Sequence, residues 1–124
     1  MTAYLFVGEK PSGLAYAKGW TWKDGRLSAA TLLRAVSANG IHDFDVINLF
    51  GDHPDNPELP VPGVLRRLKR ETRRGRQIVA LGQKVRRQLK QAGIDHYVVP
   101  HPAARGLVRA VEAYNEAFRR GLGL

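Results

Sequence analysis

The sequence predicts a single α/β domain in three layers (α/β/α), in which a parallel sheet lies between helices. Four short apolar runs, rich in aromatic and β-branched residues, recur along the chain and are typical of buried strands. Helix-like segments alternate with these runs, which favours a parallel four-stranded sheet with helices on both faces. The chain has 124 residues, sufficient for one hydrophobic core, so we expect one domain over residues 1–124.

The first half of the chain carries two predicted strands and one predicted helix. Residues 4–7 (YLFV) contain no charge and predict a short buried strand. Residues 13–27 contain three glycines and no clean period, which indicates a loop. Ser28 is a good N-cap for a helix over residues 28–40, and residues 44–50 (FDVINLF) predict the second strand.

The second half supplies the other two strands and three helices. In order, we expect a proline-rich loop at 51–63, a helix from 61 or 62 to about 74, a strand at 77–81, a helix at 83–92, a strand at 95–99 and a last helix at about 107–120. The last helix carries apolar residues at helical spacing, which is typical of a helix packed on a sheet.

Composition limits the classes of partner. The net charge is +9, with 20 Lys and Arg against 11 Asp and Glu, which favours a polyanionic partner such as nucleic acid. The chain has no cysteine, which excludes disulfides, thiolate metal sites and iron–sulfur clusters. No apolar run approaches the ~20 residues of a membrane span, and no signal-peptide pattern opens the chain. We therefore expect a cytoplasmic protein that does not enter a membrane.

Two groups of basic residues differ in their expected position. The densest, residues 66–76, lies in the later part of its helix, where the helix dipole favours cations. In a βαβ unit that end lies at the edge opposite the ligand crevice, so we expect mainly a solvated face. Lys84, Arg86 and Arg87 fall in the first turn of the next helix, near the crevice, and are the better candidates for phosphate contacts with DNA.

Polar side chains follow three of the predicted strands where each strand ends. Glu9 and Lys10 come directly after residues 4–8, Asn48 lies late in the second strand, and His101 follows the fourth. In an open α/β sheet the ligand crevice lies at the carboxyl ends of the strands. Taken singly, each residue has an ordinary structural role available, such as a loop cap or a hydrogen-bonded buried histidine.

Taken together, an acid, an amide and an imidazole suit the cleavage of an N-glycosidic bond. A carboxylate stabilises a cationic sugar and orients water. An amide recognises the edge of a base through one donor and one acceptor, and an isolated asparagine can rotate to match either uracil or cytosine. An imidazole donates to the oxygen that gains charge as the base leaves.

Four stretches resemble the uracil-DNA glycosylase superfamily. GEKPS (8–12) resembles its motif 1, closest to the GEAPG-type form, and HPAARG (101–106) resembles its motif 2, the HPS-type loop. VINLF (46–50) resembles the strand that carries the base-reading asparagine, and IVALG (78–82) resembles a strand and turn before a helix. The resemblance covers about residues 4–106. It implies a sheet in the order 2-1-3-4 and hydrolysis of uracil, or of a modified pyrimidine, from a nucleotide flipped out of single- or double-stranded DNA.

The resemblance also implies roles for individual residues. Glu9 matches the acidic, water-activating position, Asn48 matches the pyrimidine-reading amide, and His101 matches the histidine that polarises the base oxygen. Trp20 or Trp22 is the candidate for stacking on the flipped base, although both can instead cover the core. The remaining implied contacts are to substrate or to DNA, and these residues are Gly8, Pro11, Ser12, Ala104 and Arg105, the last at the position of the wedge residue.

The departures from the family pattern bear on chemistry. Lys10 stands where the GEAPG branch has a small residue, so it pairs with Glu9, contacts a phosphate or attacks the sugar as a nucleophile. The loop after motif 1 forms the pocket wall in this family, and here Ser12, Gly13 and Ala15 are small while Tyr16 is large enough to close it. We therefore expect tolerance of substituted pyrimidines. The compact, cluster-free chain needs no metal or cofactor and fits a phage or phage-defence setting.

Two alternatives to a DNA glycosylase remain at this stage. One is a nucleic-acid-binding domain that kept the fold and lost catalysis, which is expected if Lys10 locks Glu9. The other is an enzyme that releases or transfers bases on free nucleotides, for which binding depends much less on salt than DNA binding does. We expect the protein to act as a monomer.

Overall fold

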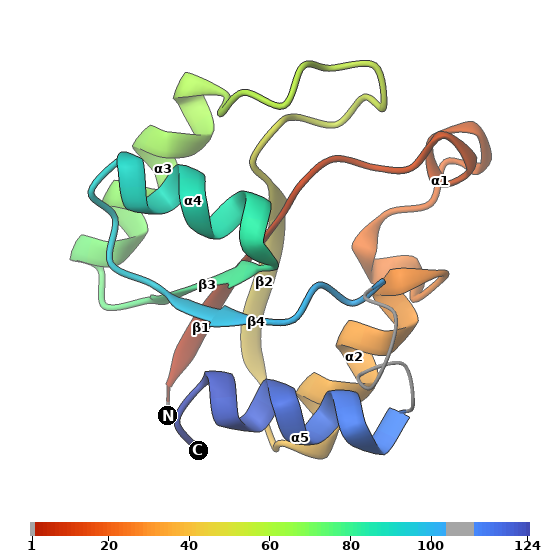
Figure 1. Ribbon diagram of the computed structural model, residues 1–124, viewed down its shortest axis with the longest axis vertical. Helices are drawn as coiled ribbons and strands as arrows, with labels where there is room; N and C mark the ends of the chain where they lie inside the picture. Colours follow the sequence, from red (N-terminus) through yellow and green to blue (C-terminus); the bar gives the residue numbers. More distant parts are fainter. Residues whose placement is uncertain (1, 104–110) are drawn as a thin grey trace.

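Four parallel strands form the centre of the computed structural model, which describes residues 2–103 and 111–124 (Figure 1). The strands are β1 (Ala3–Gly8), β2 (Asp43–Asn48), β3 (Gln77–Leu81) and β4 (Tyr97–Val99). They lie in the order β2-β1-β3-β4, and each neighbouring pair is parallel. The predicted four-stranded parallel sheet and its 2-1-3-4 order are therefore confirmed.

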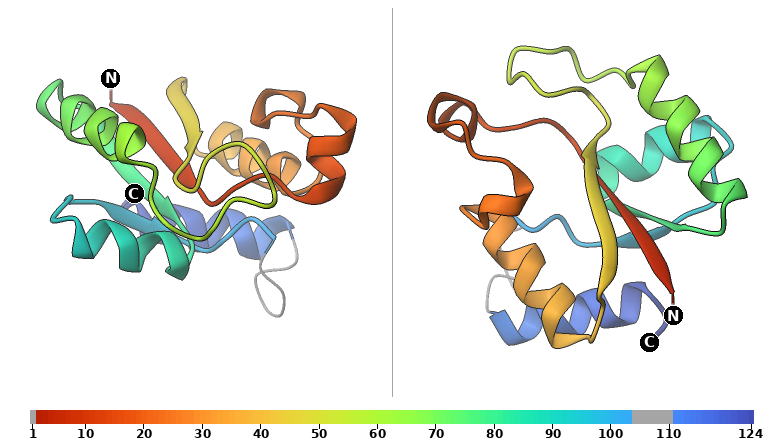
Figure 2. Two further views of the ribbon diagram at one scale, coloured as in Figure 1. Left: turned by 90° about the horizontal axis from the view of Figure 1, so that it is seen from above. Right: turned by 180° about the vertical axis from the view of Figure 1, so that it is seen from behind.

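Helices cover both faces of the sheet, which gives the predicted three layers (Figure 2). α2 (Ser28–Ala38) and α5 (Val111–Gly121) pack on one face, and α3 (Pro62–Arg73) and α4 (Gln83–Gln91) pack on the other. Because side chains alternate along a strand, Tyr4 and Phe6 enter the first core, whereas Leu5 and Val7 enter the second. None of the helices in the described part of the chain is both long and apolar enough to cross a membrane.

Aromatic contacts fasten α5 to the sheet. Phe118 is fully buried, and its ring centroid lies 5.7 Å from that of Phe6 and 6.3 Å from that of Tyr114. Gly121, at the end of α5, lies so close to the Val98 carbonyl that no side chain fits there. These contacts fix the helix that borders the fourth strand, and with it the chain that follows β4.

The segment 13–27 departs from the predicted loop, because it forms two short helices. α1 spans Gly13–Lys18 and a 3-10 helix spans Trp22–Asp24. The Ser12 hydroxyl caps α1 by accepting from the Ala15 N–H at 3.1 Å. The Asp24 carboxylate accepts from the Thr21 N–H at 2.6 Å, which caps the 3-10 helix. Local caps therefore override the lack of a clear helical period.

Other boundaries differ by a few residues from those predicted. β4 begins at Tyr97 instead of residue 95. Ser28 is the first residue of α2 instead of its N-cap, a position that Leu27 occupies with a φ of 56°. The predicted start of the last helix, at residue 107, lies outside the described residues.

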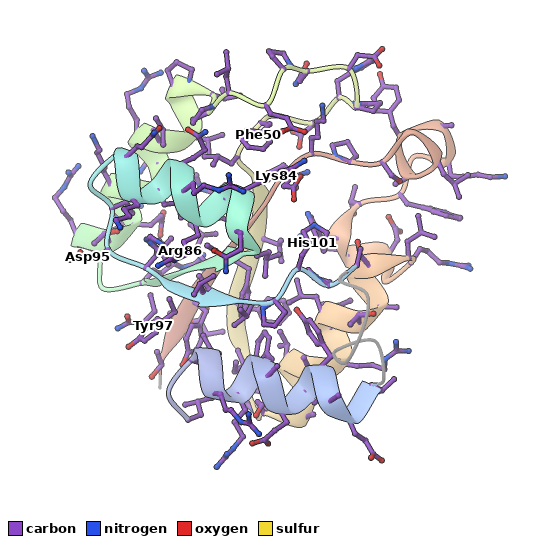
Figure 3. The ribbon with its side chains drawn as sticks, viewed as in Figure 1. Phe50, Lys84, Arg86, Asp95, Tyr97 and His101 are labelled. Atoms are coloured by element: carbon purple, nitrogen blue, oxygen red, sulfur yellow. The ribbon has the colours of Figure 1, made fainter. Side chains whose placement is uncertain are left out.

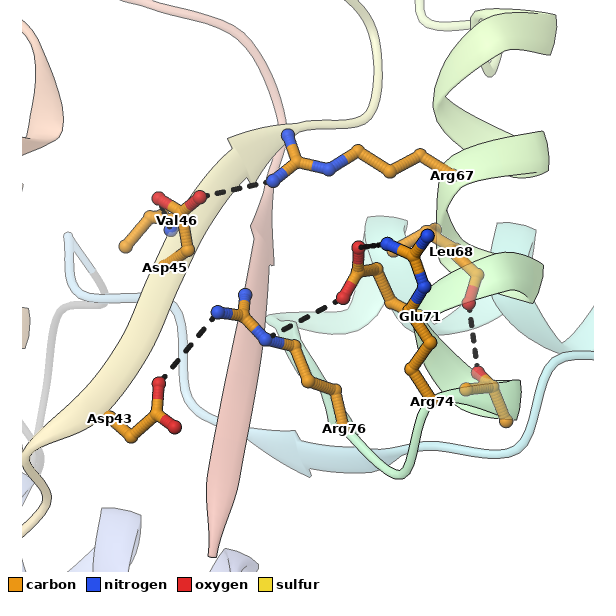
Figure 4. A network of polar contacts seen from close by, with 9 residues as sticks. Asp43, Asp45, Val46, Arg67, Leu68, Glu71, Arg74 and Arg76 are labelled. Carbon is orange, nitrogen blue, oxygen red and sulfur yellow. Dashed lines mark hydrogen bonds and ion pairs between the residues drawn. The ribbon is translucent and has the colours of Figure 1, made fainter.

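β2 forms one edge of the sheet, and ion pairs with α3 and with the turn after it lie along this edge (Figure 4). The Asp45 carboxylate accepts from the Val46 N–H at 2.8 Å and from the Arg67 guanidinium at 3.0 Å. Arg76 lies 3.7 Å from the carboxylate of Asp43, at the start of the same strand. Part of the basic stretch 66–76, expected to be solvated, is thus paired with the acids of β2.

Candidate active site

The carboxyl ends of the strands bring Glu9 and His101 together. The Glu9 Oε2 atom lies 3.5 Å from the His101 Nε2 atom, although β3 separates the two strands that precede these residues. Gly82 ends β3 with a φ of 95°, and a Cβ atom there would lie 3.0 Å from the His101 Cβ atom. Because glycine has no side chain, the chain after β4 crosses the end of β3 and reaches Glu9.

The protonation of His101 follows from its surroundings. The His101 Nδ1 atom lies 3.0 Å from the Ala103 N–H and accepts from it, so the neutral ring carries its proton on Nε2, facing Glu9. Burial lowers the pKa of His101; Glu9 opposes this shift and Lys84 adds to it. The imidazole is therefore neutral at pH 7 and presents an N–H donor at the site.

Tyr114 holds the chain that leads to His101. Its hydroxyl donates to the Pro100 carbonyl at 2.7 Å, and burial raises the pKa of Tyr114, so the hydroxyl keeps its proton. A buried hydrogen bond of this kind contributes about 1 kcal/mol and fixes direction as well. α5 thereby positions the histidine loop, although it contributes no side chain to the site itself.

The lowered pKa of His101 predicts a fold that weakens in mild acid. The unfolded chain binds a proton near the ordinary value of 6.5, whereas the folded chain binds it only at lower pH. Below that value the unfolded state holds more protons, so the free energy of unfolding falls as the pH decreases. We expect the wild-type melting temperature to fall more than that of His101→Gln between about pH 7.5 and about pH 5.

Circular dichroism at constant ionic strength measures this difference. His42→Gln, which removes an exposed histidine, is the control and should follow the wild type. If the melting temperatures of wild type and His101→Gln fell by the same amount over this pH range, the histidine would not be held neutral by the fold.

Among the lysines and arginines that the structure describes, Lys84 lies nearest Glu9. Its Nζ atom lies 3.8 Å from the Glu9 carboxylate and 3.0 Å from the Glu58 carboxylate. It lies in the first turn of α4, at the same edge of the sheet as His101 (Figure 3). Arg86 and Arg87 follow in the same helix, but both are exposed and contact Gln83. Of the three predicted phosphate contacts, the structure brings only Lys84 to Glu9.

Lys10 makes a contact that the sequence did not indicate. Its Nζ atom donates to the Asn56 carbonyl at 2.6 Å, and the Asn56 side chain donates to the Phe50 carbonyl at 2.9 Å. Lys10 therefore ties the chain after β1 to the loop after β2. The cation beside Glu9 is Lys84, so Glu9 is not locked by Lys10.

Asn48 is held by two side chains. Its Oδ1 atom accepts from the Trp22 indole N–H at 3.0 Å, and its Nδ2 atom donates to the Asp52 carboxylate at 3.3 Å. Gly8 leaves space for the indole, because a Cβ atom there would lie 2.8 Å from the Trp22 ring. If the amide were turned by 180°, its NH2 group would face the Trp22 indole N–H and its oxygen would face the Asp52 carboxylate. These two neighbours therefore fix the orientation of the amide.

A cavity of about 1020 Å³ lies beside Asn48, along the open edge of β2. Its walls are mainly aromatic and aliphatic, and they include Tyr16, Trp20, Trp22, Phe44, Val46 and Val64. Neither Glu9 nor His101 lines this cavity. Trp22 both lines it and packs on Gly8, the residue before Glu9, so the indole stands at the boundary between the cavity and the Glu9–His101 pair.

The other predicted site residues have varied positions. Pro11 lines the cavity, and the Trp20 ring lies 5.5 Å below the Arg26 guanidinium. Ser12 is exposed and caps α1. Ala104 and Arg105 lie outside the described residues. Within residues 2–103 and 111–124, no three His, Asp or Glu side chains are grouped to hold a metal ion.

No family model matches the chain, and no curated protein matches it. The site places a carboxylate between a neutral imidazole N–H and an ammonium, and an amide of fixed orientation ends the neighbouring strand β2.

Proposed function

We propose that the protein is a DNA glycosylase, a compact member of the uracil-DNA glycosylase superfamily, which hydrolyses the N-glycosidic bond of uracil or a modified pyrimidine. The observation that carries the proposal is the Glu9 carboxylate, held 3.5 Å from His101 and 3.8 Å from Lys84 at the carboxyl edge of the sheet. The +9 net charge supports DNA as the partner.

The two central groups suit the two charges that develop as the bond breaks. The Glu9 carboxylate stabilises the cationic sugar and orients the attacking water. The His101 Nε2–H donates to the base oxygen that becomes negative. At 3.5 Å the contact between Glu9 and His101 is longer than a strong hydrogen bond, so both groups remain available to a substrate.

The fixed amide of Asn48 supports a preference among bases. Its Oδ1 atom keeps a second lone pair, and its Nδ2 atom keeps a second hydrogen. A uracil edge offers a ring N–H and a carbonyl, which match this pattern, whereas cytosine offers a ring acceptor and an amine. Reading cytosine requires the rotated amide, which Trp22 and Asp52 oppose.

A base-release assay on matched oligonucleotides tests the proposal. We expect release of uracil and of uracils substituted at the 5-position, with cytosine disfavoured at least about tenfold, because a mismatched polar edge leaves buried groups unpaired. Asp52→Ala removes one partner of the amide and should weaken this preference. Equal release of uracil and cytosine would refute the fixed-amide explanation, and release of no base would refute the glycosylase proposal.

A second candidate function is DNA binding without catalysis. It is favoured by one observation, the hydrogen bond from Trp22 to Asn48, because the base-reading oxygen already has a donor. Under this alternative the oligonucleotides bind but no base is released. Under the glycosylase proposal the incoming base uses the second lone pair or displaces the indole.

A further inference from the structure

Glu58 places a carboxylate among the basic groups beside the candidate active site. It lies in the loop between β2 and α3, and its Oε1 atom accepts from the Lys84 Nζ atom at 3.0 Å. This hydrogen bond and the charge of Lys84 lower the pKa of Glu58, and the charge of Lys10 acts in the same direction. Lys84 thus contacts this exposed anion directly, and Lys10 reaches the same loop at the Asn56 carbonyl, two residues before Glu58.

We propose that Lys84 and Lys10 form a subsite for a backbone phosphate of the bound DNA, and that the Glu58 carboxylate occupies this subsite in the free protein. The inference rests on the proposed function and names the part of the substrate that this side of the site recognises. A lysine ammonium binds carboxylate and phosphate oxygens by the same charge-assisted hydrogen bonds.

The balance of charge supports the exchange. Lys84 and Lys10 carry two positive charges, and Glu9 and Glu58 carry two negative charges. When one phosphate takes the place of Glu58 at Lys84 and the exposed Glu58 side chain turns to solvent, one anion in contact with Lys84 is exchanged for another, and Lys84 also remains in contact with Glu9. A phosphate is therefore accepted next to the catalytic carboxylate without uncompensated repulsion.

Glu58 is the carboxylate that is easily displaced. Its side chain is 49% exposed, whereas that of Glu9 is 22% exposed and also contacts His101. Exposed ion pairs contribute little free energy, so breaking the Lys84–Glu58 pair costs little. The Lys10 ammonium has three hydrogens and uses one on the Asn56 carbonyl, which leaves two for a ligand.

Binding of a labelled single-stranded oligonucleotide without a releasable base, measured by fluorescence anisotropy over a range of salt concentrations, tests the subsite. We expect Glu58→Gln to bind about threefold to fivefold more tightly than wild type at low salt, the scale of one exposed ion pair. The gain should shrink as salt rises, because salt also screens the Lys84–Glu58 pair.

Two further variants sharpen the test. Glu116→Gln makes the same charge change on α5, beside Arg119 and Arg120 and away from the site, and should give a smaller change in affinity. The double variant Glu58→Gln/Lys84→Met should lose the tighter oligonucleotide binding of Glu58→Gln. Circular dichroism confirms that each variant is folded.

The outcomes separate this inference from the proposed function. Equal effects of Glu58→Gln and Glu116→Gln would show that Glu58 does not occupy a phosphate site, even if base release is observed. A specific effect of Glu58→Gln without base release would retain the subsite and overturn the glycosylase proposal. Absence of DNA binding by both wild type and Glu58→Gln would overturn both.

Discussion

Glu9→Gln is expected to lower the rate of base release at least about 100-fold, the scale of one positioned catalytic group. Glutamine keeps the shape of the side chain but removes the negative charge that lies 3.5 Å from His101. The sugar cation then loses its stabilising partner, and the attacking water loses its acceptor. Single-turnover release of the best base in the oligonucleotide panel measures the effect.

Glu116→Gln is the matched control, because it removes a carboxylate from the exposed face of α5 and should retain full release. Full release by Glu9→Gln would exclude the carboxylate from the chemistry and direct attention to Lys10. An amine nucleophile forms a Schiff base with the sugar, so borohydride would then trap a covalent adduct with DNA.

Phe118→Ala is expected to lower the free energy of unfolding by about 3–5 kcal/mol, as for other large aromatic side chains removed from a core. The ring is fully buried and packs on Phe6 and Tyr114. The loss of Phe118 also loosens the helix whose Tyr114 hydroxyl holds Pro100, so base release should decline as well. Urea denaturation measures the change in stability.

Val111→Ala on the same helix is the control for this prediction. Val111 is 44% exposed, so its truncation should change stability by no more than about 0.5 kcal/mol. A loss below about 1 kcal/mol for Phe118→Ala would contradict the proposed anchoring of α5 to the sheet.

The parallel sheet was predictable because it depends on local patterns that recur, whereas its 2-1-3-4 order was expected from the family resemblance. Apolar runs that alternate with helices specify a parallel sheet, and residues at the ends of such strands meet at one edge. Glu9 and His101 were predicted to meet on this basis, and they lie 3.5 Å apart. Asn48 was likewise expected at the same edge, and it ends β2.

The contacts of the site residues were not predictable, because they join segments far apart in the chain. Lys10 meets Asn56 across 46 residues, and Trp22 meets Asn48 across 26 residues. Each contact depends on the path of an intervening loop, which local patterns do not define. The proximity of Lys84 to Glu9 was missed because it depends on how the first turn of α4 faces the end of β1.

The open edge of β2 carries its own protection against aggregation. Backbone groups alternate along a strand, and the Leu49 N–H donates to Gly8 of β1, so the Val46 N–H points to the open side. The Asp45 carboxylate takes up this donor and is itself bound by Arg67. A strand from another molecule thus meets a charge and an occupied donor at the middle of the edge. The large cavity beside β2 can therefore stay open to solvent without the edge acting as a template for fibrils.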